Sequence, residues 1–237
     1  MASAFAFAGQ GPLACSRALI VGDAYPQFIR RLRDAAGEAS VGPTDDPANG
    51  IGPLIDAAAL DAAREDLDAA RRDGRCVVER DHASLFQQTE GCFFGPVVVA
   101  DVAPNAAILR RETAAPILAV VPTPSLDAAI EIANDSPSPL AAVFFSRSPG
   151  NIEAVRGQLR VRALFINRAT GRSLIDRHPV GGLGGVGAGL PPGGPDFLRR
   201  FMNAVTISEN VMRHGLVGTE AAAVEDARTA FSSEQPV

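Results

Sequence analysis

The second half of the chain alternates short apolar runs with amphipathic segments, and this pattern restricts the fold class more than any other feature. From residue 105 the segments are NAAILRRE, PILAVVP, SLDAAIEIAND, LAAVFFSR, NIEAVRGQL and RALFIN. Strands that alternate with helices are typical of α/β domains. We therefore predict a mainly parallel sheet flanked by helices. The predicted core residues are Ile117, Leu118, Val120, Ile130, Ile132, Val143, Phe144, Phe145, Val155, Leu164, Phe165 and Ile166.

The first half predicts two amphipathic helices. Residues 24–37 place apolar side chains at helical spacing among arginines. Asp56 can cap a second helix that runs to about Asp73. The segment between these helices is rich in proline and glycine, which predicts a long loop, and the runs CVVER and GPVVVADV that follow are predicted strands. In the second half, Ser125 and Asn151 are the predicted N-caps of two further helices.

Composition excludes several classes of function. All 22 basic residues are arginine, so chemistry that needs a lysine amine is absent. A net charge of -5 lacks the positive field that nucleic acid would require. No apolar run approaches the roughly 20 residues of a membrane-spanning helix, and the N-terminus lacks the basic flank of a secretory signal. We expect a cytoplasmic protein without a nucleic-acid partner or a membrane span.

Metal and dinucleotide motifs are also missing from the sequence. The three cysteines have no CxxC spacing, and the three histidines lie far apart, so we predict neither a metal site nor a disulfide framework. The glycine-rich segment 178–195 follows no clear strand, and no acidic residue follows about 20 positions later on a second strand. We therefore predict a loop that is held by backbone contacts, and not a Rossmann fingerprint.

The segment AVTISENV near the end of the chain alternates like a strand. A strand in this position needs a neighbour, since the unpaired backbone N–H and C=O groups of an edge strand pair with strands of other chains. We predict an α/β domain over residues 1–203, an oligomerisation strand over 204–213 and a flexible tail over 214–237.

The order of several segments resembles a known family. GQGPLACSR, VGPTDDPANGIGPLID, GCFFGPVVVADV, RRETAAPILAVV and LFINRATG follow one another as in the catalytic half of aldehyde dehydrogenases. GGPDFLRRFM and INRATGRSLIDRHPVGG resemble the 1-pyrroline-5-carboxylate (glutamate semialdehyde) dehydrogenase branch, which includes the proline utilisation A proteins. The resemblance covers about residues 3–212. It implies the catalytic-domain fold, and a complete member also has an N-terminal half with the nucleotide-binding domain.

The resemblance assigns roles to individual positions. The nucleophilic cysteine of the family falls on Pro12, which has no thiol, and the serine that follows it and helps to hold the substrate carboxylate is Leu13. A second serine with that role, in the glycine-rich loop, falls on Val186. The ribose-binding glutamate is kept as Glu112, whereas the aromatic residue near the nicotinamide is Ala114. The resemblance therefore implies that aldehyde oxidation is lost.

We predict no catalytic residue and no metal ligand in the chain, and Glu112 is the one candidate cofactor contact. Cys15 matches a second, non-catalytic cysteine of the branch, and a helix at this point would turn its sulfur away from the site.

Three hypotheses follow. The first is a non-catalytic domain that covers, braces or oligomerises in proline catabolism. Alone, such a domain uses no cofactor, and its partner is either another copy or the missing nucleotide-binding half. The second is the catalytic fragment of an NAD-dependent glutamate semialdehyde dehydrogenase. The third is a small-ligand binding module built on the glycine-rich loop and Glu112.

Overall fold

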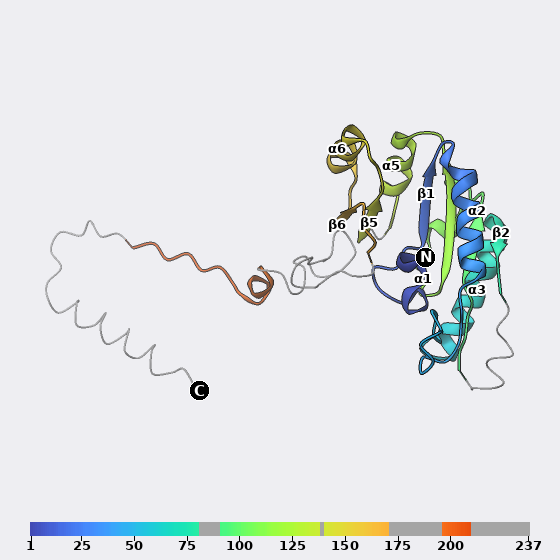
Figure 1. Ribbon diagram of the computed structural model, residues 1–237. Helices are drawn as coiled ribbons and strands as arrows, with labels where there is room; N and C mark the ends of the chain where they lie inside the picture. The colour runs from blue at the N-terminus through green and yellow to red at the C-terminus, as the bar shows by residue number, and fades with distance from the viewer. Residues whose placement is uncertain (81–90, 138–139, 171–195, 210–237) are drawn as a thin grey trace, which may run out of the picture. The chain divides into compact units, whose positions relative to one another are not determined.

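The computed structural model describes residues 1–80, 91–137, 140–170 and 196–209 (Figure 1). The chain divides into two compact units, Met1–Arg200 and Phe201–Val237. The strands are β1 (Arg17–Val21), β2 (Arg75–Val78), β3 (Val97–Ala100), β4 (Ile117–Thr123), β5 (Ala141–Phe144) and β6 (Ala163–Ile166). The α-helices are α1 (Ala2–Phe5), α2 (Ala24–Gly37), α3 (Ala57–Asp73), α5 (Leu126–Asn134) and α6 (Pro149–Gln158), and the 3-10 helices are η1 (Ala6–Gly9), η2 (Ala107–Arg110) and η3 (Phe197–Phe201).

The strands form two sheets in an α/β arrangement. The larger sheet has the order β1-β4-β3-β2, with β1, β4 and β3 parallel and β2 antiparallel at one edge. Strands β5 and β6 pair in parallel in a separate two-stranded sheet. The predicted parallel α/β fold is therefore confirmed. The expectation that all the strands belong to one sheet is wrong, because β5 pairs with β6 and not with the larger sheet.

The core lies on the inner strands of the larger sheet. All four residues of β3 are buried, so both faces of that strand are covered. Among the predicted core residues, six are buried: Ile117, Leu118, Val120, Ile130, Val155 and Phe165. Ile132, Val143, Phe144, Leu164 and Ile166 are partly buried. The prediction of Phe145 as a core residue is wrong. It follows the last residue of β5, and its side chain is 67% exposed.

Two of the predicted helix caps are confirmed. The Asp56 carboxylate accepts a hydrogen bond from the Ala59 amide at 2.8 Å, and the Ser125 hydroxyl accepts one from the Ala128 amide at 3.2 Å. The prediction of Asn151 as an N-cap is wrong.

The N-cap of helix α6 instead lies three residues before the predicted one. Ser148 is its N-cap and accepts a hydrogen bond from the Asn151 amide at 3.3 Å. Pro149 occupies the first turn, where its missing N–H costs nothing and its fixed φ suits a helix. The run NAAILRRE likewise forms only the short 3-10 helix η2.

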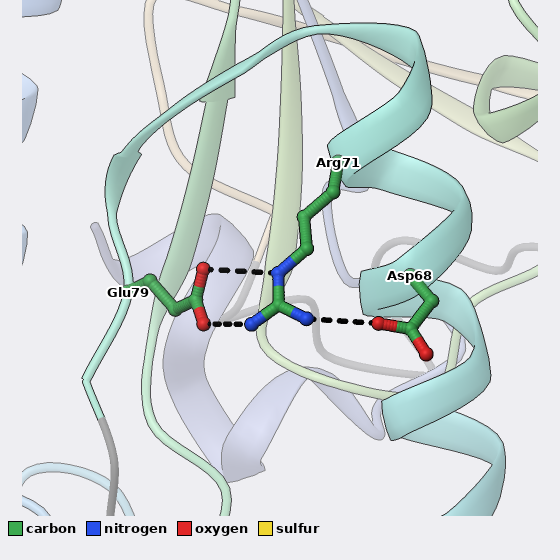
Figure 2. Close-up of polar contacts among 3 residues, drawn as sticks. All are labelled: Asp68, Arg71 and Glu79. Atoms are coloured by element: carbon green, nitrogen blue, oxygen red, sulfur yellow. Dashed lines mark hydrogen bonds and ion pairs between the residues drawn. The ribbon is translucent and has the colours of Figure 1, made fainter.

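An arginine joins helix α3 to the residue that follows strand β2. Figure 2 shows the Arg71 guanidinium between two carboxylates. It donates to both oxygens of Glu79 and, at 2.8 Å, to Asp68 on its own helix. These bonds, first of all the one to Glu79, raise the pKa of Arg71. Arg80, the residue after Glu79, donates from Nη1 to the carbonyl oxygens of Gly37 and Ala39 at 2.8 and 3.0 Å. The segment that follows β2 is therefore fixed both to α3 and to the end of α2.

The second unit begins within η3. Residues 202–209 are in neither helix nor strand and are exposed; Val205 and Ile207 are 79% and 88% exposed. The strand predicted over 204–213 was expected to pair with another chain or domain, so it stays a prediction. In the part of the chain that the structure describes, no helix combines the length and the apolar character needed to cross a bilayer.

Candidate functional site

The loop that precedes β1 contains Pro12, the position that the resemblance assigns to the family nucleophile. The backbone of Phe7, Ala8 and Gly9 lies in the left-handed region, with φ of 53°, 54° and 72°. Phe7 and Ala8 are strained there, because the β-carbon of an L-residue clashes with its own backbone. A β-carbon at Gly9 would lie 2.3 Å from the carbonyl oxygen of Ala115. Only glycine allows the loop to approach the segment before β4 this closely.

The side chain of Gln10 fixes the loop from the other side. Its Oε1 accepts a hydrogen bond from the Ile55 amide at 2.9 Å. Its Nε2 donates to the carbonyl oxygens of Phe7 and Pro53 at 3.1 and 3.3 Å. The side-chain amide of Gln10 thus forms hydrogen bonds with backbone groups of two separate segments. Gln10 therefore positions the loop that carries Pro12.

Pro12 occupies the second position of a tight turn. The Ala14 amide donates to the carbonyl oxygen of Gly11 at 2.9 Å, which closes the turn over residues 11–14. Proline favours this position because its ring presets φ. Pro12 is exposed and Leu13 is partly buried. The position assigned to the nucleophile therefore faces solvent and carries a saturated ring.

Cys15 is held in a different environment. Its Sγ donates to the carbonyl oxygen of Arg17 at 3.1 Å, and its amide donates to Ser3 at 2.7 Å. Burial raises the pKa of the Cys15 thiol, which disfavours the nucleophilic thiolate. The helix expected at this point is wrong, since residues 14–16 are in neither helix nor strand. The thiol instead packs against the core as a structural group.

Glu112 lies between η2 and β4 on a segment that α3 anchors. Asp66 forms an ion pair with Arg111 at 2.6 Å, and its carboxylate is only 9% exposed. Asp73, two turns further along α3, accepts a hydrogen bond from the Ile108 amide at 2.8 Å. Glu112 itself is exposed, and none of the hydrogen bonds or ion pairs among the described residues involves it. Its carboxylate is therefore available to an external donor.

The contact between Gly9 and Ala115 brings the two predicted groups of site residues to one region. Pro12 and Leu13 follow Gly9, whereas Glu112 and Ala114 precede Ala115. Ala114 is exposed and leaves no aromatic surface at its position.

Of the remaining predicted site residues, Val186 lies outside the described residues. Asn167, the residue after β6, adopts φ of 54°. Its side-chain amide accepts from the Ser146 amide and donates to the Ser146 carbonyl, both at 3.0 Å. It thereby joins the two segments that follow β5 and β6. In the described ranges, no group of three or more histidine, cysteine or acidic side chains is arranged to hold a metal ion.

Sequence reasoning missed the groups that hold the site in place. Asp66 lies between Ala63 and Ala70 on a face of α3 that is otherwise apolar and buried. An acidic residue on such a face signals a buried partner, because an unpaired buried carboxylate is strongly disfavoured. The role of Gln10 had no such signal, since its partners are backbone groups of a distant loop.

The aldehyde dehydrogenase family profile matches residues 1–207. The chain belongs to the aldehyde dehydrogenase family. It is 35% identical over 209 residues to a 1-pyrroline-5-carboxylate dehydrogenase of Geobacillus sp. (strain WCH70), and the match covers 88% of this chain and 40% of that protein. The chain thus spans about 40% of the length of the curated aldehyde dehydrogenases it matches.

Two solved aldehyde dehydrogenase-related structures share the fold. Proline utilization A from Bdellovibrio bacteriovorus superposes with a TM-score of 0.81 at 33% identity, over 90% of this chain and 22% of that one. A 1-pyrroline-5-carboxylate dehydrogenase from Thermus with bound NAD gives a TM-score of 0.75 at 29% identity, over 84% of this chain and 38% of that one. The predicted resemblance and fold class are therefore confirmed.

The residues present fit NAD only in part. Glu112 can accept a hydrogen bond from a ribose hydroxyl. One exposed carboxylate does not hold an adenine ring or a pyrophosphate, and the negative charge of Glu112 would repel the latter. The described residues around Glu112 therefore do not form an NAD site by themselves.

Proposed function

We propose that this chain is a non-catalytic aldehyde dehydrogenase domain that covers, braces or oligomerises within a protein assembly of proline catabolism. The observation that carries the proposal is Pro12, exposed in a tight turn at the position that the resemblance assigns to the nucleophile. Covalent oxidation of an aldehyde in this family begins with attack by a thiolate, and a pyrrolidine ring cannot supply one.

The nearest thiol in the sequence does not compensate. Cys15 donates to the backbone of Arg17, and burial raises its pKa. A thiol of this kind is mostly protonated at neutral pH and reacts slowly. The absence of a hydroxyl at Leu13 removes, in addition, one expected contact to the substrate carboxylate. These features support a structural role for the loop.

The proposal includes the partners and the cofactor. We expect a cytoplasmic domain that assembles with another copy of itself or with a nucleotide-binding half. Alone it would need no cofactor, and NAD would bind only where the family activity is retained. Glu112 stays the candidate cofactor contact, since its carboxylate is exposed on a segment that Asp66 anchors.

The direct test is an activity assay on the purified full chain. Glutamate semialdehyde and NAD are added, and NADH formation is followed by absorbance. We expect no turnover above the rate without protein. The matched variant is Cys15→Ser: turnover that this variant abolishes would show that Cys15 acts as a nucleophile and would overturn the proposal.

A second candidate function is the catalytic fragment of an NAD-dependent glutamate semialdehyde dehydrogenase. It is favoured by the 35% identity to a full-length 1-pyrroline-5-carboxylate dehydrogenase of which the chain covers 40%. Its test is reconstitution with the remaining part of that Geobacillus protein, for the wild type and for Pro12→Cys. Turnover by the wild-type mixture would establish the fragment. Turnover by the Pro12→Cys mixture alone would support the loss of the nucleophile.

A further inference from the structure

A groove lies between helix α2 and the edge strand β2. Its volume is about 370 Å³. Its lining residues are Tyr25, Pro26, Ile29, Arg30 and Arg33 from α2, and Arg75 and Val77 from β2. None of these residues belongs to the loop of Pro12 or to the segment of Glu112, so an inference about the groove does not depend on the proposed function.

The two walls of the groove are joined at one end by a shared carboxylate. The Tyr25 hydroxyl donates to Oδ1 of Asp101 at 2.8 Å and accepts from the Asp101 amide at 2.6 Å. Arg75 donates from Nε to Oδ2 of the same carboxylate at 2.9 Å. Asp101 follows β3 in the left-handed region, with φ of 61°. The start of α2 and the start of β2 are therefore fixed to one point.

The walls are joined again at the other end. Arg80, two residues after β2, donates to the carbonyl oxygens of Gly37 and Ala39 at the end of α2. From Tyr25 to Gly37 a helix rises about 18 Å. From Arg75 to Arg80, two residues beyond the end of β2, an extended backbone spans about 17 Å. These similar lengths allow the contacts at both ends to form together. The groove is pre-formed, which lowers the entropic cost of binding a ligand.

The rim of the groove carries three arginines, two of which have acidic partners within the chain. Arg33 pairs with Asp34, and Arg75 pairs with Asp101. Arg30 is exposed, and none of the ion pairs or hydrogen bonds among the described residues involves it. In a chain of net charge -5, the rim therefore has one guanidinium group in excess of its acidic partners. Guanidinium groups bind carboxylates in a planar two-point geometry.

The floor of the groove is apolar. Ile29 and Val77 are partly buried and Pro26 is exposed beside them. A small inorganic anion would leave this apolar surface exposed to water. The negative net charge of the chain disfavours the binding of a nucleic acid. Carboxylates next to apolar side chains match both the rim and the floor.

We propose that the groove binds an acidic, extended peptide segment of a partner protein. Carboxylates of the segment pair with Arg30 and with Nη1 of Arg33, since Asp34 occupies only Nε and Nη2 of that arginine. The apolar side chains of the segment lie on Ile29 and Val77. Tyrosine and arginine are enriched at protein interfaces because each combines an apolar body with a polar end. Tyr25 and Arg75 serve as the fixed end of the groove, since both are already held by Asp101.

The test uses the full 237-residue chain and a fluorescently labelled peptide of alternating glutamate and leucine, with binding followed by anisotropy. We expect saturable binding that weakens at least about tenfold in the double variant Arg30→Ala/Arg33→Ala, the loss typical of removing charge partners at an interface. The matched control is Arg31→Ala. Arg31 is exposed on the same helix but does not line the groove, so its removal should change the affinity less than about twofold. Circular dichroism checks that each variant is folded.

Three outcomes would overturn the proposal. The first is no saturable binding. The second is an equal loss for Arg31→Ala, which would mean attraction to helix charge in general. The third is recognition of charge alone. It would be seen as equal affinity for the glutamate–leucine peptide and for a peptide of alternating glutamate and serine, or as displacement of the peptide by an equal concentration of citrate or phosphate. Selective loss in Val77→Asp would support the apolar contact.

Discussion

The α-carbon of Gly9 faces the carbonyl oxygen of Ala115 so closely that a β-carbon at position 9 would stand 2.3 Å from that oxygen. This contact joins the loop of Pro12 to the segment of Glu112. The loop is thus held by Gly9 and by the side-chain amide of Gln10, neither of which depends on the residue at position 12.

Replacing Gly9 with alanine should destabilise the protein. The new β-carbon meets backbone atoms that cannot move aside, and φ of 72° is unfavourable for alanine. We expect a loss of about 2–4 kcal/mol in the free energy of unfolding, measured by urea denaturation. The matched control is Gly157→Ala in helix α6, where nothing lies within 4 Å of the added carbon. That variant should be neutral or more stable by up to about 1 kcal/mol, and equal losses for both would refute the contact.

Sequence patterns predicted those parts of the fold that depend on local spacing. Helices α2 and α3 follow from apolar periodicity and from caps such as Asp56, and strand β3 follows from a continuous apolar run. The division into two sheets did not follow, since strand pairing is set by contacts between distant segments. Phe145 was placed in the core because it is apolar. Its exposure could not be predicted, since the end of β5 at Phe144 is set by pairing with the distant strand β6.

Asp66→Asn tests the anchor of the Glu112 segment. The substitution keeps the shape of the side chain but removes the charge that pairs with Arg111 at 2.6 Å. Because the Asp66 carboxylate is only 9% exposed, we expect a loss of about 2–3 kcal/mol in unfolding free energy. Asp68→Asn on the same helix is the control. Its carboxylate is 63% exposed, so its removal should have little effect, and a reversed order of the two losses would contradict the anchor.

The candidate site could be predicted only where a residue type carries the information. Pro12 and Leu13 can be recognised as unsuited to the chemistry because proline has no thiol and leucine no hydroxyl. The groups that position them could not be predicted, because Gln10 acts on the backbone of Phe7, Pro53 and Ile55. Backbone partners leave no pattern in the side-chain sequence.

Tyr25 offers a direct measurement of the fixed end of the α2–β2 groove. Burial, together with the neighbouring Asp101 carboxylate, raises the pKa of Tyr25 to about 12 from its ordinary value of 10.0. Tyr25 is the only tyrosine and the chain has no tryptophan, so the ultraviolet absorbance of phenolate reports this group alone.

The native protein should titrate near pH 12 and the denatured protein near pH 10. Since the folded pKa is raised, the stability contributed by Tyr25 is present below pH 10 and is lost as the pH rises towards 12. Asp101→Asn removes a negative neighbour and should lower the native midpoint. A native midpoint equal to the denatured one would show that the Tyr25 hydroxyl is neither buried nor held by Asp101.

Pro12→Cys tests the exposure of the position that the resemblance assigns to the nucleophile. A thiol there should react with iodoacetamide faster than Cys15, which is packed against the core and has a raised pKa. Mass spectrometry of peptides taken at successive times gives the rate at each cysteine in one sample, with Cys76 and Cys92 as internal references. Labelling of Cys15 at the same rate as position 12 would contradict the assigned environment of the Cys15 thiol.

Deleting residues 204–213 tests the predicted oligomerisation strand. Val205 and Ile207 alternate with polar residues and are 79% and 88% exposed in the single chain, and apolar side chains on such a segment are stabilised when another chain covers them. We expect the deletion to lower the mass measured by light scattering to that of a smaller assembly. Removing the acidic tail 218–237 is the control and should leave the assembly intact, because that segment carries no comparable alternation. An unchanged mass after the first deletion would place the subunit contact elsewhere on the domain.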